Sequence, residues 1–269
     1  MNLGKRGPLF VVLATLAFFC LAGRSAAQTL INLPNASDAV APPADPSGHD
    51  PGSGRVGAGF RMSSLGFGGE VAAEVTHSTN IRAGINFFSY SRGYIDHGIQ
   101  YAGDLRWFST DAHYDWFPFA HALHLSPGLI VFNDNHVNAS ASVPAGNTFT
   151  LNGVGYFSDP ANPVNGTAKL SFNKLAPTIM IGLGNLVPRT GKHFSFNIEG
   201  GVAFQGSPKI ALNLVGSACI PTPHGPTCQN VASNSTVQSN VQGEQTRISD
   251  DLSPFKYYPL VSLTLGYRF

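Results

Sequence analysis

The sequence predicts an all-β fold, a closed antiparallel up-and-down transmembrane β-barrel of about eight strands with one short helix in its last long loop. Three observations predict this fold: an export signal at the N-terminus, short two-faced strands repeated along the chain, and a last strand that alternates up to the final residue. The composition agrees, because 30 glycines, 19 prolines and 19 phenylalanines favour strands and turns over helices.

Composition and charge exclude several classes of protein. A chain of 269 residues with 43% hydrophobic and 12% charged residues is too apolar to be an acidic or basic disordered protein. The formal net charge of +1 gives no electrostatic footprint for a nucleic acid. We therefore expect no nucleic-acid partner.

Residues 1–27 are predicted to be a cleaved signal peptide. Lys5 and Arg6 form a positively charged n-region, and residues 9–22 are an almost unbroken apolar stretch. The small residues that a signal peptidase needs precede the cleavage site at Ala27. The alternative is an uncleaved N-terminal anchor, but this apolar stretch is shorter than the roughly 20 residues that span a bilayer. We expect cleavage after Ala27.

Residues 28–53 are predicted to form a disordered, Pro-rich leader. The segment is rich in Pro, Ala and Asp and has no hydrophobic periodicity. Its prolines are Pro34, Pro42, Pro43, Pro46 and Pro51. The barrel is expected to occupy residues 54–269.

The first strand begins where this leader ends. Residues 56–62 place apolar side chains at every even position, with arginine and glycine at the odd positions between them. An alternation with period two is typical of a strand with two different faces. Seven further segments repeat the pattern, although Pro127 and Pro177 weaken it in two of them: residues 70–75, 81–87, 101–107, 123–131, 175–183, 194–204 and 261–269.

The connections alternate in length, as in an up-and-down membrane barrel with short turns on one side and long loops on the other. Three are short and two are long: residues 77–80, 116–120 and 188–192, then residues 133–169 and 206–258. The connection at residues 63–66 is short where a long loop belongs. The number of strands could therefore be eight or ten.

A helix is predicted inside the last long loop, between Asn234 and Leu252. Val237, Val241, Ile248 and Leu252 are spaced by four, seven and four residues, which places them on one helical face. This helix could cap the rim of the barrel, or it could act as a plug or a partner-binding element.

The last strand carries the most specific signal in the chain. Apolar or aromatic side chains occupy every second position from Val261 to Tyr267 and Phe269, where the chain ends. This pattern resembles the terminal strand of the outer-membrane barrels of Gram-negative bacteria. The resemblance implies a location in the outer membrane, in contact with its lipid. It also implies that Tyr267 and Phe269 are read by the barrel-assembly machinery.

Four further segments are similar to a poorly characterised family of small, OmpA-like barrels. They are residues 115–119, 125–129, 182–185 and 204–208, and the likeness runs from about residue 56 to residue 269. This resemblance implies a fold and hardly narrows the function.

The strand face opposite the apolar one carries charges of both signs. These residues are expected to point into the lumen: Arg61, Glu70, Glu74, Arg82, Asp104, Arg106, Glu199 and Arg268. An eight-stranded barrel is just wide enough for side chains to fill it, and buried charges persist there when they are paired. We expect an ion-pair network, with a narrow ion-conducting path as the alternative.

Cys219 and Cys228 are the two cysteines left after removal of the signal peptide. In an oxidising compartment such a pair predicts a disulfide, which would stabilise the loop by about 2 to 3 kcal/mol. Only His224 lies nearby, too few ligands for a metal site, so we expect no metal and no cofactor.

These observations predict a non-enzymatic, monomeric outer-membrane barrel with a structural or narrow-pore role. One alternative is a secreted periplasmic β-sandwich that binds a ligand or partner. A second is a lipid-modifying outer-membrane hydrolase with His124 as base and Ser126 as nucleophile, for which the sequence offers no orienting acid.

Overall fold

The computed structural model describes residues 54–119, 122–189 and 192–269. The predicted signal peptide at residues 1–27 and the predicted leader at residues 28–53 lie outside this part of the chain. Residues Gly54–Phe269 form one compact unit.

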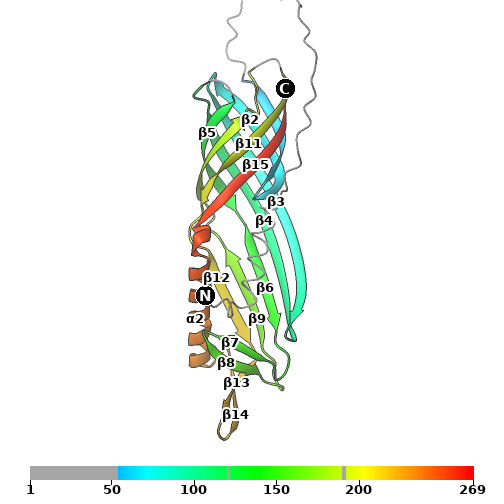
Figure 1. Cartoon of the computed structure of the whole chain (residues 1–269), viewed down its shortest axis with the longest axis vertical. Helices are drawn as coiled ribbons and strands as arrows, with labels where there is room; N and C mark the ends of the chain where they lie inside the picture. The colour runs from blue at the N-terminus through cyan, green and yellow to red at the C-terminus, as the bar shows by residue number, and fades with distance from the viewer. Residues whose placement is uncertain (1–53, 120–121, 190–191) are drawn as a thin grey trace, which may run out of the picture. The chain divides into compact units, whose positions relative to one another are not determined.

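Eight strands close into a ring, in which each pairs antiparallel with its neighbours and the last pairs with the first (Figure 1). Their order around the ring follows the sequence: β1 (Val56–Ser63), β2 (Gly66–Thr76), β3 (Thr79–Asp96), β4 (Ile99–Trp116), β5 (Leu123–Asn133), β10 (Ala176–Gly184), β11 (Phe194–Phe204) and β15 (Tyr257–Arg268). The predicted closed barrel of eight strands is confirmed. The β-sandwich alternative is wrong, because two packed open sheets would leave strand edges that this ring does not have.

Further strands, formed by the two long connections of the chain, continue the sheet beyond the ring. β6 (His136–Ser142) pairs with β4, β9 (Asn165–Ser171) pairs with β6, and β12 (Lys209–Val215) pairs with β9. A second sheet contains β7 (Thr148–Leu151), β8 (Val154–Ser158), β13 (Ser217–Thr222) and β14 (Gly225–Asn230). We call all these strands, the helix below and the β3–β4 hairpin beyond Phe87 the extension.

The two long connections are therefore not the irregular loops that their Asn, Ser, Gly and Pro content suggests. They pair with each other and with β4, and they bury an apolar cluster that includes Val143, Val164 and Leu214. Burial of this cluster away from water supplies the driving force that a solvated loop lacks.

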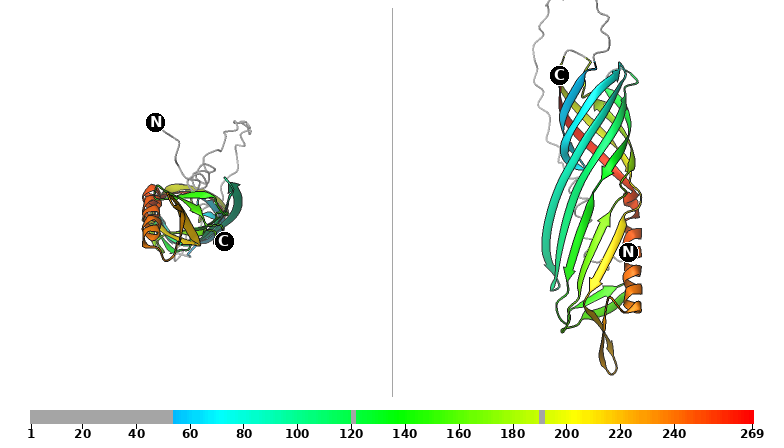
Figure 2. Two further views of the ribbon diagram at one scale, coloured as in Figure 1. Left: turned by 90° about the horizontal axis from the view of Figure 1, so that it is seen from below. Right: turned by 180° about the vertical axis from the view of Figure 1, so that it is seen from behind.

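The predicted helix is confirmed as α2 (Ser235–Asp251), followed by the 3₁₀ turn η1 (Ser253–Lys256). Asn234 caps its first turn, since its side-chain oxygen accepts a hydrogen bond from the backbone N–H of Val237 at 2.9 Å. Val237 and Val241 are buried in the apolar cluster of the extension. The helix stands beside β12, along the extension and away from the eight-stranded ring (Figure 2).

No helix in the described part of the chain combines the length and the apolar character that crossing a bilayer would require.

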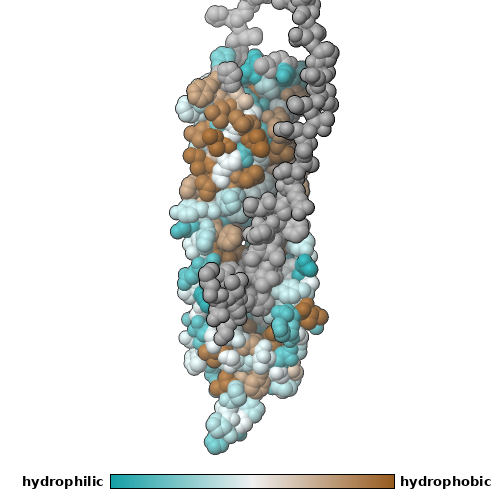
Figure 3. All heavy atoms as spheres, viewed as in Figure 1, coloured by the Kyte–Doolittle hydropathy of each residue, from teal (hydrophilic) through white to brown (hydrophobic). Residues whose placement is uncertain are grey.

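The direction of side-chain polarity reverses within single strands. In the ring part of β4, Phe108, Tyr114 and Trp116 point outward and are exposed, whereas Asp111 and Asp115 point inward and are buried. Beyond Phe108 the same strand places Leu105 inward and Arg106 outward. The outside is thus apolar around the ring and polar around the extension, as Figure 3 shows for one face.

Candidate functional site

The lumen of the ring holds two arginines and four carboxylates that converge from five strands. Arg61 comes from β1, Arg82 from β3, and the carboxylates come from β2, β4 and β11: Glu70, Asp111, Asp115 and Glu199. All six side chains are buried. Strand alternation places them, because each occupies the face opposite its outward-pointing neighbours in the strand.

Arg82 lies at the centre of this network and is 1% exposed. Its Nη1 donates to Glu70 Oε2 at 3.1 Å and to Glu199 Oε2 at 2.6 Å, and its Nη2 donates to the other oxygen of Glu199. Its Nε and Nη2 donate to the two oxygens of Asp115 at 3.1 and 3.0 Å. The guanidinium therefore binds two carboxylates in a bidentate manner, the geometry in which arginine pairs most strongly.

Arg61 joins a second pair of carboxylates. Its Nη1 donates to Glu70 Oε2 at 3.1 Å, the oxygen that also accepts from Arg82, and to Asp111 Oδ1 at 3.0 Å. Its Nη2 donates to Asn86 Oδ1 at 3.0 Å. Glu70 thus connects the two arginines into one network.

Two hydroxyl groups and an imidazole contact further carboxylate oxygens. Ser262 Oγ donates to Glu199 Oε2 at 3.0 Å, and Ser126 Oγ donates to Asp115 Oδ1 at 2.7 Å. The imidazole Nε2 of His124 lies 3.1 Å from Glu199 Oε1. These hydrogen-bond partners lower the free-energy cost of burying so many charges, because an unpaired buried charge destabilises the fold by several kcal/mol.

Inward glycines make room for these long side chains. A Cβ at Gly84 would lie 2.4 Å from Arg61 Nη2, and one at Gly182 would lie 2.6 Å from Glu199 Cγ. Both distances are shorter than any stable contact. Glycine at these strand positions therefore lets the network fill the lumen.

An apolar layer closes the lumen on the side of the extension. Its buried side chains come from the β1–β2 turn and from four ring strands: Leu65, Ile130, Ala176, Met180, Ala203 and Leu260. Tyr258 packs against this layer, and its hydroxyl donates to the carbonyl of Ser64 at 2.7 Å. Beyond it, the Trp107 and Tyr258 rings meet edge to face at 5.9 Å.

The turn between β10 and β11 closes the opposite end. Leu186 and Val187 are buried against Ala72 of β2. A Cβ at Gly266 would lie 2.1 Å from Leu186 Cδ1, so the turn inserts where the strand has no side chain. Asn185 Oδ1 accepts from the Nδ2 of a β3 asparagine at 2.8 Å, which fixes the turn to the ring wall.

The predicted lumen residues fall into three groups. Four join the network described above: Arg61, Glu70, Arg82 and Glu199. Glu74 and Arg268 lie near the β10–β11 turn, where Glu74 Oε1 is 3.8 Å from Arg189 Nε and Arg268 Nη1 donates to Pro188 O at 2.6 Å.

Asp104 and Arg106 form the third group, and the inward orientation predicted for them is wrong. Both lie on the outward face of β4, in the extension. The prediction places the apolar residues of this segment outward, but Leu105 is buried on the inside of the extension. In the extension the apolar side chains face the inside, where Tyr101 of the same segment packs against the buried apolar cluster.

Sequence reasoning missed Asp111 and Asp115, which supply half of the carboxylates. A signal is present, because Ser109, Asp111, His113 and Asp115 alternate with Phe108, Thr110, Ala112 and Tyr114. The predicted strand ends at residue 107 and leaves this alternation unassigned.

The lumen is poorly suited to metal binding or to hydrolysis. Ligand atoms of Asp115, His124 and Glu199 lie within 4.8 Å of one another, but Arg82 already donates to both carboxylates. Ser126 gives its hydroxyl hydrogen to Asp115, while His124 faces Glu199. The geometry expected for a serine activated by histidine is therefore not formed by these two residues.

Outside the lumen, Cys219 and Cys228 are joined by a disulfide, as predicted. They are directly opposite each other in the β13–β14 hairpin.

Comparisons with known proteins agree on the fold. No protein-family model matches the chain, and no curated protein matches it in sequence. The crystal structure of CarO from Acinetobacter baumannii aligns with a TM-score of 0.50 and 20% identity, over 80% of this chain and 98% of that chain. CarO2 of the same species gives 0.50 and 19%, with the same coverage of both chains.

A major outer membrane protein from Thermus thermophilus aligns with a TM-score of 0.30 and 14% identity, over 81% of this chain and 100% of that chain. The similarity to the two Acinetobacter structures shows the fold alone.

Proposed function

We propose that this chain is an outer-membrane β-barrel with a sealed lumen and a structural, non-enzymatic role. The observation that carries the proposal is the reversal of polarity between ring and extension. Phe196, Ile181 and Leu265 are each more than half exposed on the outside of the ring, around a buried ionic lumen. Exposed apolar surface costs about 25 cal/mol per Å² in water, and hydrocarbon removes that cost.

Closure of the ring supports the same proposal. In a bilayer core every backbone N–H and C=O must find a partner within the protein, so only helices and closed barrels can cross. Aromatic side chains at the strand ends would form the interfacial belt, for example Phe204 with Tyr257 and Phe194 with Tyr267.

Three successive layers support a sealed lumen over a conducting one. The Leu186 turn, the network around Arg82 and the apolar layer around Met180 each block the path. An ion would have to break charge-assisted hydrogen bonds and then cross a dry apolar constriction. The narrow-pore role is the less favourable alternative for this arrangement.

The last strand supports assembly in that membrane. Tyr267 and Phe269 are exposed at the end of β15 and lie with their rings 5.4 Å apart. We propose that this aromatic pair is the feature that the barrel-assembly machinery recognises, and that the folded barrel remains a monomer in contact with lipid.

Two measurements test the proposal. The mature chain should stay in the outer-membrane fraction after a carbonate wash and should migrate faster on a gel before heating than after it. In planar bilayers the folded protein should give no single-channel steps. Recovery as a soluble monomer would refute the membrane location, and reproducible steps would refute the sealed lumen while leaving the location intact.

A further inference from the structure

We propose that the outward face of the extension binds the headgroup of a phosphorylated glycolipid in the leaflet that surrounds the barrel. This inference rests on the proposed membrane location. Three zones of side chains, arranged in order away from the ring, carry it: an aromatic rim, a basic row and a polar groove.

The aromatic rim marks the edge of the apolar band. Phe87 and Phe108 face each other across β3 and β4, and both point outward. Phe132 of β5 meets Phe108 edge to face at 5.8 Å, and Lys174 Nζ lies 5.4 Å from the centre of the Phe132 ring. Rings at such a boundary can contact acyl chains on one side and polar headgroups on the other.

The basic row comes next on the same outward face. The registers of four strand pairs align Ser89, Arg106, His136, Ser171 and Lys209 across the sheet. Arg106 and Lys209 are exposed. Cations that lie immediately outside an apolar band are placed where lipid phosphates lie.

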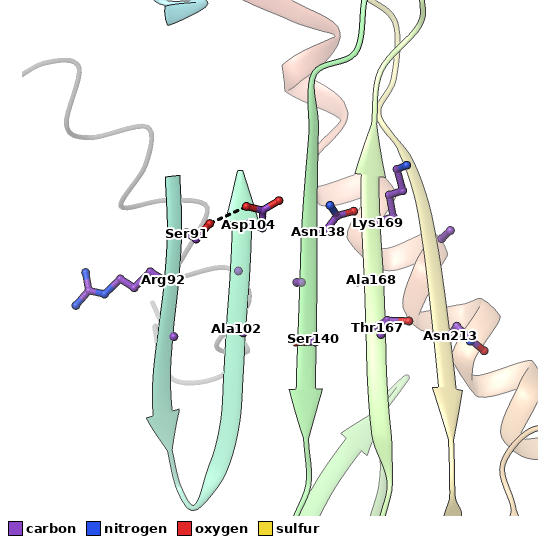
Figure 4. Close-up of a pocket in the computed structure, with 14 residues that line it drawn as sticks. Ser91, Arg92, Ala102, Asp104, Asn138, Ser140, Thr167, Ala168, Lys169 and Asn213 are labelled. Atoms are coloured by element: carbon purple, nitrogen blue, oxygen red, sulfur yellow. Dashed lines mark hydrogen bonds between the residues drawn. The ribbon is translucent and has the colours of Figure 1, made fainter. Parts of the chain in front are cut away.

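The next row, farther from the ring, contains a third cation, Lys169, and its other side chains are polar. Ser91, Asp104, Asn138 and Lys169 lie in one line across four neighbouring strands (Figure 4). They line an open groove of about 690 Å³ whose floor contains Gly93, Ala102 and Ala211. Small side chains keep the floor flat, and the polar ones beside it offer both donors and acceptors.

This mixture of donors and acceptors suits the hydroxyl groups of a sugar. Asp104 supplies a fixed acceptor, because Ser91 Oγ donates to its Oδ1 at 2.7 Å. Asn138 and Thr167 can each donate and accept. Each sugar hydroxyl likewise donates and accepts, so the groove offers a partner for both functions.

The local charge favours an anionic occupant. The face carries Arg106, Lys169, Lys174 and Lys209 against Asp104 and Asp134, which gives 4 − 2 = +2 with histidine neutral, and Arg92 adds one more positive charge beside the groove. In a phosphorylated, acylated sugar the acyl chains and the phosphates are both attached to the sugar ring, so the chains can contact the rim while a phosphate meets the basic row and sugar hydroxyls meet the groove. A phospholipid without sugar would use the rim and the row but leave the groove empty.

Native mass spectrometry of the full mature chain in detergent micelles tests this assignment. The probes are lipid A (a phosphorylated, acylated glucosamine disaccharide), phosphatidylglycerol and phosphatidylcholine. We expect lipid A to bind at least about tenfold more tightly than phosphatidylglycerol, because two added hydrogen bonds contribute about that much. Phosphatidylcholine should bind most weakly.

Two double variants separate the row from the groove. Arg106→Gln with Lys209→Gln should weaken both anionic lipids roughly 30-fold, since each cation near a membrane surface contributes about a factor of five. Asn213 of β12 also lines the groove, opposite Thr167. Asn138→Ala with Asn213→Ala should weaken lipid A about tenfold and leave phosphatidylglycerol unchanged. Lys192→Gln, an exposed lysine outside the extension, is the matched control and should change neither.

Each contrary result has a distinct meaning. Equal binding of lipid A and phosphatidylcholine, or no effect of the arginine and lysine changes, would overturn the site. Equal binding of lipid A and phosphatidylglycerol, with no effect of the asparagine changes, would overturn the glycolipid assignment in favour of a simple phosphate contact. Heat-modifiable migration on a gel is measured for every variant and shows whether the barrel is folded. A failure of the proposed function is thereby distinguished from a failure of the lipid site.

Discussion

At the residue scale, Arg82 is the side chain on which the lumen depends most. Replacing it in Arg82→Gln leaves Glu70, Asp115 and Glu199 buried together without the cation that binds all three. Loss of one partner from a buried charge pair costs about 3 to 5 kcal/mol. We expect the free energy of unfolding to fall by that amount, measured by urea titration in phosphatidylcholine vesicles with tryptophan fluorescence.

Arg92→Gln is the control for that experiment, because Arg92 is exposed in the extension and its replacement makes the same change in charge. Its free energy of unfolding should stay within about 0.5 kcal/mol of the wild type. Equal free energies of unfolding for the two variants would show that the network around Arg82 does not stabilise the fold.

The lumen glycines provide a second comparison at this scale. In Gly182→Ala the new Cβ would lie 2.6 Å from Glu199 Cγ and 2.7 Å from the His124 ring, whereas nothing lies within 4 Å of a Cβ at Gly200. Overpacking of this kind costs about 1 to 3 kcal/mol. The same urea titration should therefore show a loss for Gly182→Ala and little change for Gly200→Ala, and the reverse order would contradict a filled lumen.

Asp104, in the extension, gives a pH-dependent prediction. The hydrogen bond from Ser91 lowers the pKa of the Asp104 carboxyl below its ordinary value, because it stabilises the charged form. Ser91→Ala should raise that pKa, so protonation of Asp104 should begin at a higher pH than in the wild type. Carboxyl chemical shifts followed through an acid titration would measure it, and an unchanged midpoint would exclude the Ser91 contribution.

At the element scale, β4 explains both the success and the failure of sequence reasoning. Alternation identified seven of the eight ring strands, because a strand whose two faces differ in polarity must alternate, but in β4 it found only the part that lies in the extension. It misplaced Asp104 and Arg106, because β4 runs from the ring into the extension and its apolar side chains change face near Phe108. The sequence of residues 101–107 alone does not indicate that change, since it depends on the distant strands that pair with this part of β4 and on the apolar cluster that they bury. The contacts of Arg82 with β2, β4 and β11 depend on ring closure, which periodicity alone does not specify.

The β13–β14 hairpin should be an element whose stability is separate from that of the ring. Cys219 and Cys228 close a short hairpin, and β13 pairs only with β8 and β14 in the described part of the chain. Cys219→Ser with Cys228→Ser should remove about 2 to 3 kcal/mol of local stability. Limited proteolysis should then cut this hairpin faster while the heat-modifiable migration of the barrel stays the same. Loss of the folded band would show that hairpin and ring are coupled.

At the scale of the whole molecule, the ring and the extension should be separable. All ring pairings and all three layers of the lumen lie outside residues 134–174 and 205–256. Phe204 pairs with Tyr257, so a two-residue Asn-Gly turn could replace residues 205–256 directly. Ile130 pairs with Ala176, so Asn-Gly in place of residues 134–174 would complete a longer loop with residues 131–133 and 175. We expect this shortened chain to fold into vesicles with heat-modifiable migration and no conductance, because hydrocarbon outside and the Arg82 network inside are both retained. It should also lose the preference for lipid A over phosphatidylglycerol, since β6, β9 and β12 carry most of the groove. A shortened chain that cannot fold would mean that the extension nucleates the ring, and the two parts could then not be assigned separate roles.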